Sequence, residues 1–287
     1  FYSGGNNGDV TDIITSDINN SYISDNVFGG GNKASIGNGT DDVASYLTIN
    51  NSSICNVYGG GSAAPVLGST NVVLKNANIT CNVYGGGDGT TSSVVGDETG
   101  EDNPAKVSGN TNLLIDDGTT VVASVYGGGN LGMIEGNTNV TIKNATINKS
   151  IYGGGNAALV GGNTILLVSG PNVLESVYAG GNGVTAIVRG NTNLDIDNST
   201  IIGKHVFGGG NAAATGTLTT NNSTGLVNIV GATIGGNVYG GANTSVLYGE
   251  TTVNIGSAAV DNTNLVKSNI SIGGTVFGGG EANASGS

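Results

Sequence analysis

Apolar and polar residues alternate in short stretches that recur along the whole chain. Within residues 137–142, Thr138, Val140 and Ile142 share one face of an extended strand, and the polar residues between them share the other. The same alternation occurs at Ser69–Leu74, Asn110–Ile115, Asn163–Val168, Asn191–Ile196 and Glu250–Ile255. This period of two predicts a series of β-strands, each with one buried face.

A second pattern, the repeat word, joins a β-branched residue, an aromatic residue, small residues (usually three glycines) and a polar residue, most often Asn. Its aromatic positions are 2, 28, 58, 84, 126, 152, 178, 207, 239 and 277. Four intervals are identical (28 − 2, 84 − 58, 152 − 126 and 178 − 152 each give 26), and the others are longer. A constant minimum with a variable excess predicts a repeating unit of 26 residues that carries insertions in its turns.

The longest interval locates one insertion. The aromatic residues at 84 and 126 are 42 residues apart, and 42 − 26 leaves 16 extra residues. Removing residues 89–104 restores the stretch Ala105–Thr111, which matches Ala186–Thr192 of a later unit. We therefore expect a single repeat domain over residues 1–287 with a loop insertion near 89–104.

The unit that begins at Val125 predicts three short strands. They are Met133–Glu135, residues 137–142, and a third strand that starts at Ala145 and reaches Tyr152. No stretch has the periodicity of a helix. One such unit cannot bury its apolar face alone, so neighbouring units must stack. The prediction is an all-β parallel β-helix solenoid of about ten rungs, roughly 45 to 50 Å long at about 4.8 Å per rung.

The charges fit this stacking. The residue that follows the alternating strand is Lys75, Asp116, Lys143, Ser169 and Asp197 in successive units, so like charges do not adjoin. The net charge of −12 argues against nucleic acid and anionic membranes as partners. The 54 glycines are not spaced every third residue, which excludes collagen, and regular apolar clusters argue against disorder. The sequence contains no run of about twenty apolar residues, so it predicts no membrane insertion.

The aromatic residue of each repeat word is the first candidate for binding. Alternation from the preceding Val or Ile turns the ring outward or onto the corner before the glycines. An exposed file of rings would offer a platform to a carbohydrate or protein; the alternative is a structural stack that seals the corner. The candidate binding residues are Tyr58, Tyr84, Tyr126, Tyr152 and Tyr178.

Cys55 and Cys81 are one full period apart, because 81 − 55 gives 26. In-register stacking brings their Cα atoms to about 5 Å, within disulfide range. A bond between neighbouring rungs would suit a protein outside the cytoplasm. Two stacked free thiols are the alternative, and the sequence leaves both open.

Other candidates for chemistry are weaker. Asp97, Glu98, Glu101 and Asp102 lie in the insertion and could offer oxygen ligands to Ca²⁺, although a solvated loop explains them as well. His205 is the only histidine and stands at a turn position, where a structural role is expected. No nucleophile elbow, zinc motif or phosphate loop is present. We expect no enzyme activity, no resident metal and no cofactor.

The repeat word and the Asn-Thr-Asn strands extend over nearly all of the chain. In this respect the sequence resembles the parallel β-helix stalks of bacterial surface proteins and adhesins. The resemblance implies right-handed coiling and a non-catalytic stalk or adhesive module that is extracellular, on the cell surface or secreted. It would bind host or neighbouring cell surfaces through glycan or protein.

Two alternatives have different consequences. One is a carbohydrate-binding or carbohydrate-degrading β-helix, which needs clustered acidic residues. The other, less favoured, is an ice-binding solenoid, which needs regular outward Thr residues. The chain starts within one copy of the repeat word and stops just after another. We therefore expect a fragment of a longer protein, whose ends stack or continue with further repeats.

Overall fold

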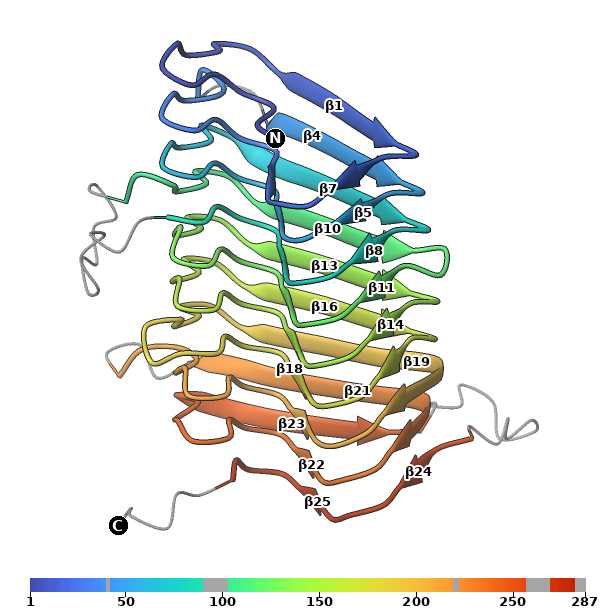
Figure 1. Cartoon of the computed structure of the whole chain (residues 1–287). Coiled ribbons are helices and arrows are strands. Elements are labelled where there is room, and N and C mark those ends of the chain that lie inside the picture. Colours follow the sequence, from blue (N-terminus) through green and yellow to red (C-terminus); the bar gives the residue numbers. More distant parts are fainter. Residues whose placement is uncertain (40–41, 90–102, 219–221, 257–268, 282–287) are drawn as a thin grey trace.

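The computed structural model describes residues 1–39, 42–89, 103–218, 222–256 and 269–281. The chain folds as a parallel β-solenoid of about eight turns, and the described part contains no helix. Figure 1 shows the turns stacked in sequence order, from the first (blue) at the top to the last (red) at the bottom. The predicted all-β solenoid is thus confirmed.

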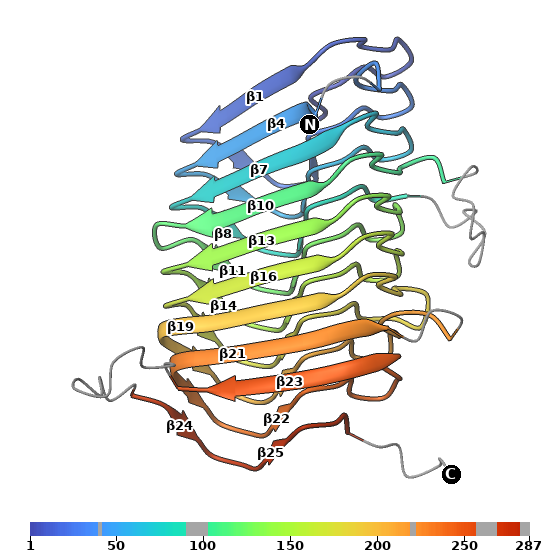
Figure 2. The ribbon, with the colours of Figure 1, turned by 180° about the vertical axis from the view of Figure 1, so that it is seen from behind.

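Most turns contain one long strand and two short ones, and in the turns of β19 and β21 the long strand also includes the first short one. The long strands are β1 (Ile14–Asn19), β4 (Val43–Asn50), β7 (Ser69–Lys75), β10 (Thr111–Asp116), β13 (Thr138–Lys143), β16 (Thr164–Ser169), β19 (Thr192–Ile202), β21 (Ser223–Ile234) and β23 (Gly249–Ile255). Figure 2 shows them side by side on one face of the molecule.

The chain turns a corner after the long strand. The short strands that follow this corner are β2 (Tyr22–Ile23), β5 (Ser53–Ile54), β8 (Asn78–Ile79), β11 (Thr120–Val121), β14 (Thr146–Ile147), β17 (Asn172–Val173) and β24 (Ser271–Ile272). The strands of the repeat word are β3 (Val27–Phe28), β6 (Val57–Tyr58), β9 (Val83–Tyr84), β12 (Val125–Tyr126), β15 (Ile151–Tyr152), β18 (Val177–Tyr178), β20 (Val206–Phe207), β22 (Val238–Tyr239) and β25 (Val276–Phe277).

All the ladders are parallel and largely in register. The strands of the repeat word form a 9-stranded sheet, and the other strands form a 16-stranded sheet because β19 and β21 continue around the corner. Thr138 pairs with Thr111 on one side and with Thr164 on the other. Asp116 pairs with Lys75, which confirms the register expected from the charges.

The strands within one turn differ in detail from the prediction. The expected strand Met133–Glu135 is reduced to one bridging residue, Ile134, which pairs with Val107 and Val160. The expected third strand is divided into β14 and β15, since the corner at 148–150 interrupts its pairing. The bridging residues Val107 and Val188 occupy the same row, as expected from the match of Ala105–Thr111 with Ala186–Thr192 once residues 89–104 are removed.

The number of turns is lower than expected. The prediction of about ten took every copy of the repeat word as one rung, whereas the structure has about eight turns. The copies at Tyr2 and Phe277 stand at the two ends of the stack. Their side chains are 41% and 42% exposed because each ring has a neighbour on one side only.

Apolar side chains fill the inside of every turn. On β13, Thr138, Val140 and Ile142 are buried and the residues between them are partly exposed, as the alternation predicts. The main core combines the inner residues of the long and short strands, and the bridging residues form a smaller cluster beside it. Stacking of turns, not any single turn, therefore creates the core.

Close approach of the turns explains the glycines. A Cβ added to Gly127 would lie 2.2 Å from the carbonyl oxygen of Gly153 in the next turn. At the corner after β13 the backbone of Asn144 has a φ of 43°, a left-handed conformation that Asn and Gly tolerate best. The chain therefore turns at Asn144, between the end of β13 and the start of β14.

Candidate functional site

The aromatic residues of the repeat words form one continuous stack, here called the aromatic row. Ten rings follow one another with centroids 4.7–5.0 Å apart and planes within 1–9° of parallel. The eight internal rings, from Phe28 to Tyr239, form a cluster of their own outside the main core. Each internal ring therefore has both of its faces covered by its neighbours in the stack.

The five candidate tyrosines are buried. Their exposed fractions range from 4% for Tyr84 to 8% for Tyr178. Of the two arrangements left open by the sequence, the structure has the sealed stack, and the exposed file of rings is absent from it. No ring face within the stack is open to a flat ligand such as a sugar. Tyr58, Tyr84, Tyr126, Tyr152 and Tyr178 thus have a structural explanation that requires no ligand.

The hydroxyl groups of the aromatic row meet two polar rows. Burial raises the pKa of Tyr58 above its usual range, and the nearby Asp88 carboxylate raises it further. Burial also raises the pKa of Tyr126, and a hydrogen bond with Ser124 partly lowers it again. Asn237 donates a hydrogen bond from Nδ2 to the Tyr239 hydroxyl at 2.8 Å. These contacts cover the outer ends of the rings.

The first polar row, here called the asparagine row, follows the glycines of the repeat words. Its members are Asn6, Asn32, Ser62, Asp88, Asn130, Asn156, Asn182, Asn211, Asn243 and Glu281. Asn156 donates from Nδ2 to Asn130 Oδ1 at 2.9 Å, and Asn182 donates to Asn156 Oδ1 at 2.8 Å. The amides thus form a chain of hydrogen bonds along the stack. The recurring Asn after the glycines was a signal for this row, although we did not predict its bonding.

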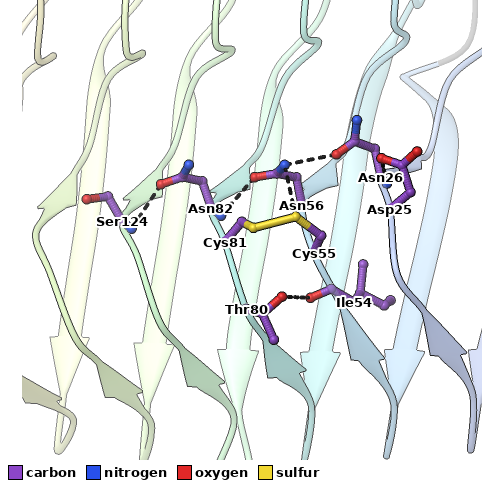
Figure 3. The surroundings of a disulfide bond; sticks show 9 residues. All are labelled: Asp25, Asn26, Ile54, Cys55, Asn56, Thr80, Cys81, Asn82 and Ser124. Atoms are coloured by element: carbon purple, nitrogen blue, oxygen red, sulfur yellow. Dashed lines mark hydrogen bonds between the residues drawn. A yellow bond between two sulfur atoms is a disulfide. The ribbon is translucent and has the colours of Figure 1, made fainter.

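The second polar row, here called the corner row, stands two residues before each ring. Its members are Asn26, Asn56, Asn82, Ser124, Ser150, Ser176, His205, Asn237 and Thr275. Along much of the row a side-chain atom accepts the backbone N–H of the next member. The Asn82 N–H donates to Asn56 Oδ1 at 2.9 Å, and the Ser124 N–H donates to Asn82 Oδ1 at 3.1 Å (Figure 3).

Cys55 and Cys81 are joined by a disulfide beside the corner row (Figure 3). Their Cα atoms are 4.9 Å apart, and the Cys81 N–H donates to the Cys55 carbonyl oxygen at 3.0 Å. Both residues are only partly buried. The stacking distance derived from the period is thus reproduced, and the bond lies across two neighbouring turns.

A hydroxyl row crosses the inside of the solenoid. The Thr138 hydroxyl donates to the Gly153 carbonyl oxygen at 2.6 Å, and Thr111 donates to Gly127 in the same way at 2.6 Å. Equivalent bonds come from Ser45, Thr70, Thr164, Thr192 and Thr251. The sequence predicted inward Thr residues but gave no sign of their acceptors, which lie 15 or more residues away in the chain.

The remaining candidates are the acidic residues of the insertion and His205. Asp97, Glu98, Glu101 and Asp102 lie outside the described residues. Among the described residues, no group of three or more His, Cys, Asp or Glu side chains is placed to hold a metal ion. His205 lies in the corner row, at the turn position expected for it. No helix in the described ranges has the length and apolarity needed to cross a membrane.

Three ion pairs connect described residues of neighbouring turns. Lys204 and Glu175 are 3.3 Å apart, Lys106 and Glu135 2.9 Å, and Lys75 pairs with Asp117 at 3.4 Å. They are partly or largely exposed, so each contributes little to stability.

The surface that remains for binding is therefore the outer face of the turns. Comparison with protein-family models, with curated proteins and with solved structures gives no match to this chain.

Proposed function

We propose that this chain is a non-catalytic extracellular stalk or adhesive module of a bacterial surface protein. The observation that carries the proposal is the constant cross-section of the described turns. The same rows of Val and Ile, Thr, aromatic residues and Asn recur from turn to turn. About eight turns at about 4.8 Å each make a rod about 38 Å long, a shape suited to holding other segments apart.

The disulfide supports the proposed location. Disulfides persist in oxidising surroundings such as the cell exterior and are rare in the cytosol. Cys55 and Cys81 are the only cysteines of the chain, and both enter the bond. Labelling of free thiols in the natively produced protein tests this point. We expect labelling only after reduction, and labelling without reduction contradicts the proposed location.

The charge also supports this proposal. With 20 acidic and 8 basic residues, the protein carries a net charge of −12 and repels nucleic acids and anionic lipids. Adhesion would then use outward polar residues of the long strands, such as Asn112, Asn139 and Asp195. Their side chains point away from the core.

A combined binding and turnover assay tests the proposal. The whole chain is incubated with an array of glycans and of extracellular-matrix proteins, and bound and released material is analysed by mass spectrometry. We expect retention on a subset of surfaces with every ligand intact. Cleaved glycan products would refute the non-catalytic proposal in favour of a carbohydrate-degrading β-helix. Retention on glycans alone would favour the carbohydrate-binding alternative.

The ice-binding alternative has its own test. The regular Thr residues of the long strands are buried, with exposed fractions of 0–1% for Thr70, Thr111, Thr138, Thr164 and Thr192. This row therefore cannot contact ice. We expect no thermal hysteresis in a solution of the protein, and a measurable hysteresis would contradict the proposal.

A further inference from the structure

One position of the corner row differs chemically from the others. In the neighbouring turns the row is built from Asn, Ser and Thr, whose side-chain oxygen atoms do not change protonation near neutral pH. At His205 the acceptor is an imidazole nitrogen. Histidine is the side chain whose charge changes most readily between about pH 5 and 8.

The geometry places this nitrogen within the contact between two turns. The backbone N–H of Asn237, in the next turn, donates to His205 Nδ1 at 2.9 Å. The backbone N–H of His205 in turn donates to the Ser176 hydroxyl oxygen at 3.2 Å. The bond from Asn237 thus requires a lone pair on Nδ1, which only a neutral imidazole can supply.

The surroundings hold the ring in this position. The imidazole is tilted against the rings of Phe207 and Tyr239, with centroids 6.1 and 6.3 Å away. A Cβ on Gly236 would lie 2.5 Å from Nδ1, so the absence of a side chain there makes room for the ring. The ring therefore has little freedom to turn Nδ1 away from Asn237.

We propose that His205 is a pH-responsive joint between the turn that contains β20 and the turn that contains β22. Protonation places a hydrogen on Nδ1 and sets two N–H donors against each other. The hydrogen bond is lost, and the two turns separate locally at this corner. Because Asn237 Oδ1 accepts the Thr275 N–H at 2.8 Å, the loosening extends toward the C-terminal turn.

The charged groups around the joint do not replace the lost bond. On the side of β18, Glu175 pairs with Lys204 at 3.3 Å and accepts from the Ser150 hydroxyl at 3.4 Å. On the side of β22, Tyr239 accepts from Asn237 Nδ2. None of the three ion pairs between described residues includes the imidazole. A proton on His205 therefore gains no carboxylate partner in exchange for the acceptor it removes.

The test compares the wild type with His205→Asn, which restores the residue found at Asn56 and Asn82. Amide hydrogen exchange of the Asn237 N–H is measured by NMR between pH 7.5 and 5.0 and corrected for the intrinsic pH dependence of exchange. In the wild type we expect the corrected rate to rise about fivefold or more as the pH falls, the effect of losing about one hydrogen bond. In His205→Asn we expect a constant corrected rate.

The comparison isolates the protonation of His205, because it is the only histidine of the chain and the N-terminal amine is common to both proteins. The amide of Ile151 serves as an internal control, since it donates to a backbone oxygen of Ser176. Equal pH profiles for the Asn237 amide in the two proteins would overturn the proposal. If His205→Asn does not fold, the wild type alone decides by comparison of Asn237 with Ile151. Equal protection at both pH values refutes the joint.

Discussion

The hydroxyl row inside the solenoid can be tested at Thr138. Its side chain is fully buried, and its hydroxyl donates to the Gly153 carbonyl oxygen at 2.6 Å across the interior of the same turn. Val has nearly the same shape but no hydroxyl. Thr138→Val therefore removes the donor and leaves the buried carbonyl oxygen without it. Leaving a buried acceptor unsatisfied costs about 1–3 kcal/mol of the free energy of unfolding.

Thr141→Val is a matched control on the same strand. Thr141 points outward, and its row contains Val73, Leu114 and Leu167 in other turns. The same chemical change at this position is therefore expected to alter stability by no more than about 0.5 kcal/mol. The difference between the two variants isolates the inward hydrogen bond from the general effect of replacing Thr with Val.

Equilibrium unfolding in urea at 25 °C provides the measurement, followed by both circular dichroism and tyrosine fluorescence. Two probes are needed because stacked repeats can unfold in parts, and coincident transitions justify a single free energy. We expect Thr138→Val to have the lower midpoint with an unchanged slope. If it is as stable as Thr141→Val, the reasoning that the hydroxyl row braces the turn is refuted.

Three further predictions concern the disulfide and the aromatic row. Replacing Cys55 and Cys81 with Ser opens a 26-residue loop and should lower the free energy of unfolding by up to about 3.5 kcal/mol. Reduction of the wild type should lower it by the same amount, and a larger loss in the Ser variant would contradict the assignment to the disulfide. Tyr152→Phe should cost about 1 kcal/mol or less, as Phe207 already occupies this row, whereas Tyr152→Leu should cost about 2–4 kcal/mol through lost stacking and packing; equal thermal stabilities would disprove the role of the stack. Because burial raises the folded-state pKa of Tyr84 above its usual range, its contribution to stability is present below about pH 10 and lost as the pH rises further. Absorbance at alkaline pH should therefore show the tyrosinate of the buried rings appearing together with unfolding, and ionisation of all tyrosines in the folded protein would contradict this.

The register of the solenoid was accessible from the sequence because stacked turns repeat their residue types. The constant period aligned Thr138 with Thr164 and Cys55 with Cys81, and removal of the insertion brought Val107 into the row of Val188. Each of these predictions depends only on counting residues between equivalent positions. Register is therefore fixed wherever the inner face of a strand must be apolar.

The burial of the aromatic row could not be obtained in the same way. Alternation from Val125 correctly directs the Tyr126 ring away from the main core, where it joins a separate cluster. The low exposure of these rings arises from stacking between turns and from polar residues at their outer ends, such as Asp88 beside Tyr58 and Ser124 beside Tyr126. A period of two residues predicts on which face of a strand a side chain lies, and it contains no information about what covers that side chain.

The distribution of constraints along a turn indicates where specificity for a partner can reside. Inner positions are tied to neighbouring turns by packing, and the corner and asparagine rows are tied by hydrogen bonds such as that from Asn156 to Asn130. Outward positions on the long strands are tied only in places, as where Asn139 donates to Asn112 and Asn228 donates to Asp195. In one outward row Val73, Leu114, Thr141, Leu167 and Asp195 follow one another in adjacent strands. A row that changes from aliphatic to hydroxyl to acidic within five turns cannot be required for stacking. Substitutions at Leu114, Thr141 and Leu167 should therefore leave stability nearly unchanged while altering retention on a bound surface, which separates the scaffold from the adhesive role.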